Sequence, residues 1–284
     1  KNNEQLNAYI DEHWVEGLHN FILIDEVQEI ESWEKSVRSY RTEENTDIII
    51  TGSNSKMLSS ELSTLIGGRY HEIYVQSLGY QEFLLFHELE DNDDALSKYI
   101  NYGGLPGLKQ VGLDEDEFVW DYIRAVFHTV MLKDIVERNN IRNVSFLNTL
   151  LRYFADTIGK LSSLNNISKF MKSQGLDVSV KSIAAYLDYF RDAYLLLTVD
   201  RFDIHGKKLL ESNEKIYFGD VGLRNLIAGG ERQGDIEKIL ENIVYQQLLR
   251  MGYDVSIGQL RAGEVDFVCT KSNERLYVQV AYLI

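Results

Sequence analysis

The chain has 284 residues and a formal net charge of −15, with 44% hydrophobic and 26% charged residues. This composition is ordinary for a folded protein, and the length suits two or three compact units. The negative charge gives no indication of bulk attraction to nucleic-acid phosphates or anionic membranes. A single cysteine, Cys269, excludes an internal disulfide and a Cys-rich zinc site, and no apolar run approaches the length of a membrane span. We therefore expect a cytoplasmic protein without membrane contact.

The first feature that points to chemistry is an apolar run, residues 21–24, that leads into two carboxylates, Asp25 and Glu26. Such a run predicts a strand buried on both faces, as in a parallel sheet. Ligands of open α/β sheets bind at the carboxyl ends of the strands, which is where both acids fall. A P-loop ATPase uses one such acid to hold Mg²⁺ and a second to orient the attacking water. The alternative is a strand that ends in a solvated turn.

A second buried strand is predicted over residues 47–51, after an amphipathic helix. The order strand, helix, strand predicts a parallel α/β sheet, so the residues that follow the second strand should lie beside Asp25. Ser53 or Asn54 would there sense a γ-phosphate or position a water, although a serine at this place also serves as a helix cap. Arg69 follows two glycines, which suits either an arginine finger or a surface turn.

The middle of the chain is predicted to be helical from about residue 79 to about residue 160, with a break at Gly103-Gly104 before the only proline. Residues 167–218 then have the pattern helix, turn, helix and two strands, which is the outline of a winged helix. DNA binding through its basic residues is one hypothesis. Plain protein contact is the other, and the net charge of −15 favours it.

Near the C-terminus, acidic and apolar side chains alternate, so that Glu264 and Asp266 point to one face of a predicted strand. With Glu241 on an upstream helix and Gln279 on the next strand, they match the layout of the restriction-endonuclease-like fold. Its metal nucleases also need a lysine that activates water, but Ala281 occupies the expected position. We therefore expect a degenerate site of Glu241, Asp266 and Gln279 in an inactive relic or a binding module, and an active nuclease is the less favoured alternative.

Six short motifs occur in a fixed order along most of the chain. They are Leu23-Ile24-Asp25-Glu26-Val27-Gln28, Trp33-Glu34, Ile50-Thr51-Gly52-Ser53-Asn54-Ser55-Lys56, Gly68-Arg69, Glu82-Phe83 and Gly103-Gly104-Leu105-Pro106. This series resembles a family of bacterial and archaeal AAA-type ATPases with a C-terminal domain of unknown function. The resemblance implies that Asp25 and Glu26 are the Walker B pair, with Asp25 on Mg²⁺ and Glu26 on the water. It also implies that Ser53 or Asn54 is sensor 1 and that Arg69 completes the site of a neighbouring subunit.

One departure from this family bears directly on activity. The phosphate-binding Walker A motif, Gly-x-x-x-x-Gly-Lys-Ser/Thr, is absent from the sequence. In the family this loop lies upstream of the region that begins here, and the chain ends within an apolar pattern, so we expect a fragment at both ends. The intact protein is expected to bind ATP and Mg²⁺ and to use hydrolysis as a conformational switch, whereas this fragment should bind ATP weakly or not at all.

The predicted fold is therefore α/β, in four parts. They are the distal part of a P-loop AAA parallel sheet (1–90), a helical region (91–160), a winged helix (161–232) and a truncated endonuclease-like α/β domain (233–284). Homo-oligomer formation and DNA contact through the winged helix are further hypotheses, and the sequence names no protein partner. The alternative function is that of a DNA-associated or regulatory binding protein whose nucleotide site is secondary or degenerate.

Overall fold

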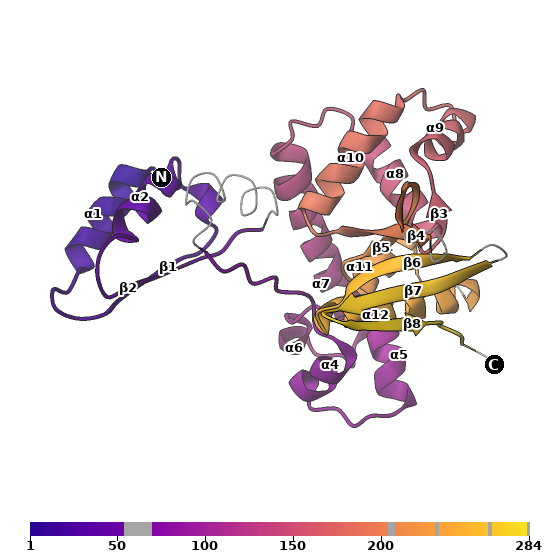
Figure 1. The fold of residues 1–284 in the computed structure, drawn as a ribbon, viewed down its shortest axis with the longest axis horizontal. Helices are drawn as coiled ribbons and strands as arrows, with labels where there is room; N and C mark the ends of the chain where they lie inside the picture. Colours follow the sequence, from indigo (N-terminus) through magenta and orange to yellow (C-terminus); the bar gives the residue numbers. More distant parts are fainter. Residues whose placement is uncertain (54–69, 204–207, 231–232, 261–262, 283–284) are drawn as a thin grey trace. The chain divides into compact units, whose positions relative to one another are not determined.

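The computed structural model describes residues 1–53, 70–203, 208–230, 233–260 and 263–282. The chain forms two compact units, Lys1–Tyr74 and Val75–Ile284 (Figure 1). Among the described residues, the first unit holds a parallel pair of strands and the second a mixed sheet of six strands. No helix in this part of the chain is both long and apolar enough to cross a membrane.

The first unit packs two helices against a parallel pair of strands. Its elements are α1 (Asn3–His13), β1 (Asn20–Ile24), the 3-10 turn η1 (Val27–Glu29), α2 (Trp33–Tyr40) and β2 (Thr46–Ile50). In the register of the pair, Ile22 lies opposite Ile48 and Ile24 opposite Ile50. The parallel pairing with a helix between the strands confirms the α/β class expected from the sequence.

Only one face of this strand pair is buried. The buried face forms a small core with the two helices, made of Leu6, Ile22, Ile24, Val27, Ile30, Trp33, Val37, Ile48 and Ile50. On the other face Phe21, Leu23 and Ile49 are 65%, 71% and 55% exposed. The prediction that the first strand is buried on both faces is therefore wrong for the described residues. Side chains alternate along a strand, so a pair of strands with helices on one side leaves every second residue uncovered.

The second unit begins with helices and ends with strands. Its helices are α4 (Tyr80–His87), α5 (Asp93–Tyr102), α6 (Leu108–Val111), α7 (Asp116–Thr129), the π-helical η3 (Val130–Glu137), α8 (Val144–Asp156), α9 (Leu164–Ser173), α10 (Val180–Asp192), α11 (Val221–Ala228), the 3-10 turn η4 (Gln233–Asp235) and α12 (Ile236–Arg250). Its strands are β3 (Leu161–Ser162), β4 (Leu196–Asp203), β5 (Lys208–Phe218), β6 (Asp254–Leu260), β7 (Gly263–Lys271) and β8 (Glu274–Val278).

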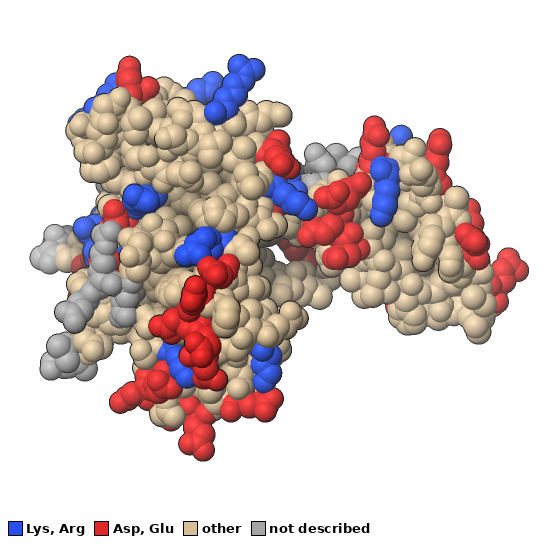
Figure 2. All heavy atoms as spheres, turned by 180° about the vertical axis from the view of Figure 1, so that it is seen from behind, with Lys and Arg blue, Asp and Glu red and all other residues tan. Residues whose placement is uncertain are grey.

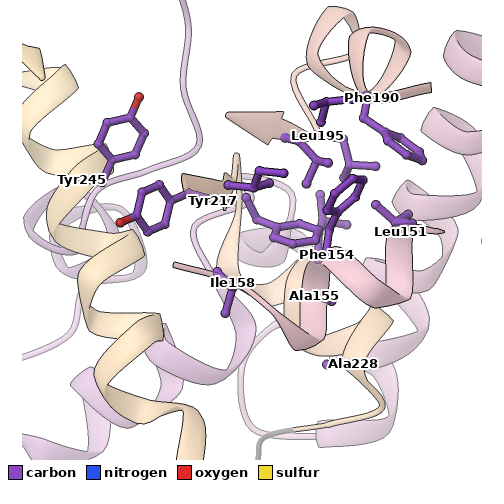
Figure 3. Packing of buried hydrophobic residues seen from close by; sticks show 14 of the residues in the cluster. Leu151, Phe154, Ala155, Ile158, Phe190, Leu195, Tyr217, Ala228 and Tyr245 are labelled. Carbon is purple, nitrogen blue, oxygen red and sulfur yellow. The ribbon is translucent and has the colours of Figure 1, made fainter. Parts of the chain in front are cut away.

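The strands of the second unit form one sheet in the order β3-β5-β4-β6-β7-β8. β5 runs antiparallel to both β3 and β4, whereas β4 and β6 are parallel. The boundary proposed at residue 232 thus falls between strands of a single sheet. A continuous core lies against it, in which Phe154 of α8 and Phe190 of α10 pack near Leu195 and Tyr217 (Figure 3). Cys269 is fully buried in the same core, as expected for a small core residue.

A single buried carboxylate, that of Asp220, joins three segments of the second unit. It accepts hydrogen bonds from the backbone N–H groups of Gly104 at 2.8 Å, Gly222 at 2.9 Å and Leu223 at 3.2 Å. Burial raises the pKa of Asp220, and these backbone hydrogen bonds to the charged form oppose the rise. The carboxylate therefore caps α11 directly after β5 and fastens the loop that follows α5 to this cap.

The glycines of that loop are required by close packing. A Cβ atom at Gly104 would lie 2.1 Å from the carbonyl oxygen of Leu78, and one at Gly103 would lie 2.2 Å from Asp220 Oδ1. Gly103 also has a φ of +74°, a region that favours glycine. The backbone N–H of Leu78 donates to the carbonyl of Gly104 at 2.7 Å. The break predicted at Gly103-Gly104 is thus the place where two backbone segments and a buried carboxylate meet.

We predict that Gly104→Ala destabilises the protein by at least about 2 kcal/mol, because the added methyl group meets backbone rather than a movable side chain. The measurement is the midpoint of urea unfolding. Gly263→Ala is the matched control, since its Cβ would meet nothing within 4 Å; its effect should stay within about 0.5 kcal/mol. Equal effects of the two substitutions would contradict this account of the loop.

Candidate functional site

The acids of the first unit lie where β1 and β2 end side by side. The hydrogen-bond ladder continues past both strands, because Thr51 N–H donates to the carbonyl of Ile24 at 2.9 Å and Val27 N–H donates to that of Thr51 at 3.0 Å. The Thr51 hydroxyl donates to Asp25 Oδ1 at 2.5 Å and accepts from the Glu26 backbone N–H at 3.0 Å. One hydroxyl thus fixes both neighbouring acidic residues at the carboxyl edge of the parallel strands, as the sequence predicted for this edge.

The backbone at Glu26 is strained. Its φ of 50° and ψ of 55° lie in the left-handed region, which costs roughly 1–2 kcal/mol for a residue with a Cβ atom. Gln28 Nε2 donates to Glu26 Oε2 and also reaches Ser53 Oγ at 3.2 Å. The Gln28 Oε1 atom is buried and has no hydrogen-bond partner among the described residues. Strain of this kind concentrates at functional sites. Gln28 also belongs to this edge, although the sequence analysis gave it no role.

The predicted site residues are thus partly brought together. Asp25, Glu26 and Ser53 share this edge, whereas Asn54 and Arg69 lie outside the described residues. Mg²⁺ in nucleotide sites is held by one or two carboxylates, with phosphate and water oxygens as the other ligands. The exposed carboxylate of Asp25 suits that part, and its orientation is fixed by Thr51. Among the described residues, no three His, Cys, Asp or Glu side chains form a group that could hold a metal ion by themselves.

The second unit gathers acidic side chains around a buried lysine. Lys215 Nζ of β5 lies 2.6 Å from Glu241 Oε1 on α12, 2.6 Å from Glu264 Oε1 on β7 and 3.9 Å from Asp266 Oδ1 on the same strand. Gln279 Nε2 donates to the other oxygen of Asp266 at 2.6 Å. The residues predicted as a degenerate nuclease-like site, Glu241, Asp266 and Gln279, are therefore neighbours in the structure.

The charges in this acidic cluster affect one another strongly. The Lys215 side chain is 5% exposed. Burial alone would lower the pKa of Lys215, but the attraction of Glu241 and Glu264 outweighs it and raises the value. Burial raises the pKa of Glu241, whose Oε1 accepts from the Tyr217 hydroxyl at 2.5 Å. Burial and the nearby carboxylates raise the pKa of Tyr217 in turn, so its phenol stays a donor.

The nuclease layout places its lysine two residues after Gln279, where this chain has Ala281. The lysine of the structure instead comes from β5, more than 60 positions upstream. Alternation along that strand places Lys215 and Tyr217 on one face, but it does not show which distant residues that face meets.

Two family models match the chain. Residues 1–84 match an AAA domain, and residues 93–234 match a domain of unknown function, DUF8612. The first match contains the edge formed by Asp25, Glu26 and Thr51. The second begins with α5 and contains the loop at Gly104, the carboxylate of Asp220 and the buried lysine.

Two relatives known by sequence have no assigned function. An uncharacterized protein of Haemophilus influenzae is 37% identical over 268 residues, which cover 93% of this chain and 66% of the relative. Uncharacterized protein MJ1544 of Methanocaldococcus jannaschii is 28% identical over 277 residues, which cover 92% of this chain and 60% of that protein. The chain therefore spans about two thirds or less of the length of these relatives.

Among solved structures, the Walker-type ATPase PABY2304 of Pyrococcus abyssi is similar in fold. The alignment covers 73% of this chain and 62% of that one, with a TM-score of 0.50 and 14% sequence identity. At this identity the alignment shows a likeness of fold alone. Because the DUF8612 match covers half of this chain, the chain belongs to the family that carries this domain of unknown function. Its first 84 residues match an AAA domain.

Proposed function

We propose that the chain provides the Walker B side of an Mg²⁺-dependent ATPase, with Asp25 as the Mg²⁺ ligand and Glu26 as the residue that orients the attacking water. The observation that carries this proposal is the Thr51 hydroxyl, which holds both acidic residues at the carboxyl edge of two parallel strands. Ligands of parallel α/β sheets bind at that edge. Mg²⁺, when bound, would neutralise charge on the phosphates as the phosphoryl group is transferred.

In this proposal the residues of the chain position the metal ion and the water and do not react themselves. Thr51 fixes the direction of the Asp25 carboxylate, and Gln28 holds the Glu26 carboxylate through its side-chain amide. Glu26 then orients water by accepting a hydrogen bond from it. We propose Ser53, whose Oγ accepts from Gln28 Nε2 at 3.2 Å, as the sensor of the γ-phosphate. We further propose that Arg69 completes the site of a neighbouring copy in a homo-oligomer.

The exposed apolar face of β1 and β2 supports a larger nucleotide-binding sheet. Parallel sheets are covered on both faces by helices, whereas Phe21, Leu23 and Ile49 are more than half exposed among the described residues. The Walker A motif is not present in the 284 residues. Both observations suit a protein in which a further part of the sheet and the phosphate-binding loop come from outside these residues.

A switch needs a connection through which movement is transmitted. Hydrogen bonds fix the first residues of the second unit to the rest of it. Ser77 Oγ donates to the Gly219 carbonyl at 3.0 Å, the Tyr99 hydroxyl donates to the Leu78 carbonyl at 3.0 Å, and Arg250 Nη2 donates to the Ser77 carbonyl. Leu78 N–H also donates to the Gly104 carbonyl. We infer that nucleotide-driven movement reaches the second unit through this anchored segment.

The segment from α8 to β5 has the order of a winged helix: α8, β3, α9, α10, β4 and β5, with β5 between β3 and β4 in the sheet. We propose that it makes protein contacts rather than DNA contacts. Its basic residues are partly paired with acids, since Lys172 lies 3.3 Å from Asp177 and Arg191 lies 3.8 Å from Asp188. On the face in Figure 2, the lysines and arginines are scattered and form no continuous basic patch. Such a surface offers little to a phosphate backbone.

We predict that Glu26→Gln lowers the rate of ATP hydrolysis by the full-length gene product by about 100-fold or more while ATP binding is retained, because only the group that orients water is lost. The measurements are phosphate release and binding of a fluorescent ATP analogue. Glu29→Gln is the control: Glu29 is exposed on the same 3-10 turn and should leave both unchanged. An unchanged rate in Glu26→Gln would contradict the assignment.

We predict that Thr51→Val lowers ATP turnover by roughly tenfold, because it removes two hydrogen bonds, each worth about 1 kcal/mol, that hold Asp25 and Glu26. Thr46→Val, at the start of β2, is the matched control, since the Thr46 hydroxyl oxygen is buried and has no hydrogen-bond partner among the described residues. This second substitution should leave turnover unchanged and should not lower the unfolding temperature. Similar turnover in the two variants would show that the Thr51 hydroxyl does not position the acids.

A further inference from the structure

The side-chain amide of Gln28 joins the two strand ends at the edge that holds Asp25 and Glu26. Its Nε2 atom donates to Glu26 Oε2, after β1, and to Ser53 Oγ at 3.2 Å, after β2. The acid and the hydroxyl are therefore held by the two hydrogens of one nitrogen atom. Displacement of either acceptor consequently changes the hydrogen bond to the other.

The orientation of this amide is fixed by its two acceptors. Gln28 Oε1 is buried and has no hydrogen-bond partner among the described residues, which is unfavourable for a carbonyl oxygen. Rotation of the amide by about 180° would turn Oε1 toward the Glu26 carboxylate, and two acceptors cannot form a hydrogen bond. The unsatisfied oxygen is therefore tolerated because Nε2 then faces both the acid and the serine.

The backbone brings Gln28 and Glu26 together. Glu26 has the left-handed φ of 50° and ψ of 55° directly before the 3-10 turn η1, and Gln28 is the middle residue of that turn. Side chains two positions apart do not face each other in a regular helix, whereas these two are in contact. The Thr51 hydroxyl holds the Glu26 backbone N–H at 3.0 Å. Thr51 thus fixes the backbone of Glu26, and Gln28 fixes its carboxylate.

We propose that Gln28 is a positioning residue that couples Glu26 to Ser53, so that contact of Ser53 with the γ-phosphate sets the direction of the acid that orients water. This inference rests on the proposed function and adds to it a dependence of the hydrolysis step on the bound phosphate. Gln28 engages Glu26 Oε2, and the water takes Oε1. Loss of the amide therefore slows hydrolysis and leaves ATP binding intact.

The test compares Gln28→Met and Gln28→Glu with wild type in the full-length gene product, by steady-state ATP hydrolysis as a function of pH. Gln28→Met removes a hydrogen bond to a charged group, so it should lower kcat about tenfold and leave KM for ATP within about twofold. Gln28→Glu places a second carboxylate beside Glu26, and two adjacent carboxylates hold a proton to higher pH than one. Because Glu26 acts in its charged form, the acidic limb of the kcat profile should move to higher pH.

The matched control is Gln5→Glu, the same chemical change in the same unit. Gln5 is exposed in the first turn of α1, and a glutamate there still completes the capping box with Asn2. This variant should keep the kcat and the pH profile of wild type. The coupling itself is measured in Gln28→Met/Ser53→Ala, which should be no more than about twofold slower than the slower single variant.

A kcat equal to or above that of wild type in both Gln28 variants, with an unmoved acidic limb, contradicts the proposal. Losses of kcat that multiply in the double variant contradict the coupling to Ser53. Gln28→Glu keeps the shape of the side chain, so it decides the question if Gln28→Met does not fold. These outcomes are distinct from failure of the proposed function, in which Glu26→Gln itself hydrolyses ATP at the wild-type rate.

Discussion

The second unit depends on one buried carboxylate. Asp220 follows β5, caps α11 and accepts a hydrogen bond from the loop that ends α5, so strand, helix and loop are fixed by the same two oxygens. The burial of Asp220 is tolerable because backbone N–H groups donate hydrogen bonds to both of its carboxylate oxygens. The loop can approach Asp220 this closely only because residue 103 is a glycine. These three segments all lie within residues 93–234, the range of the family match.

Both candidate sites hold carboxylates in fixed positions, but they do so in different ways. At the edge of β1 and β2, the Thr51 hydroxyl orients exposed carboxylates, which remain accessible to a ligand. In the second unit, Lys215 is drawn into the acidic cluster and neutralises it from within. An exposed, oriented acid suits a site that exchanges Mg²⁺ and nucleotide, whereas a buried ion cluster suits a permanent structural bond. The segment at Ser77 connects the chain of the first unit to the junction at Asp220.

The sequence predicted the parallel strands and the edge position of Asp25, Glu26 and Ser53, because apolar runs and strand order determine where such residues fall. It misjudged the exposure of Phe21 and Leu23, since burial depends on which other strands and helices are present. It grouped Glu241, Asp266 and Gln279 correctly from alternation on one hairpin and a helix. It missed Lys215, because no local pattern shows that this residue of β5 forms ion pairs with side chains of the distant α12 and β7. The roles of Gln28 and Asp220 likewise depend on contacts that only the fold creates.

The central claim is that Mg²⁺ and ATP bind at the edge formed by Asp25, Glu26 and Thr51. The most direct measurement is hydrogen–deuterium exchange of the full-length protein with and without Mg²⁺ and a non-hydrolysable ATP analogue. The account predicts slower exchange in peptides that contain residues 24–28 and 50–53, and it predicts that Asp25→Asn removes this protection. Unchanged exchange in those peptides, under conditions where the analogue is bound, would contradict it and place the nucleotide elsewhere.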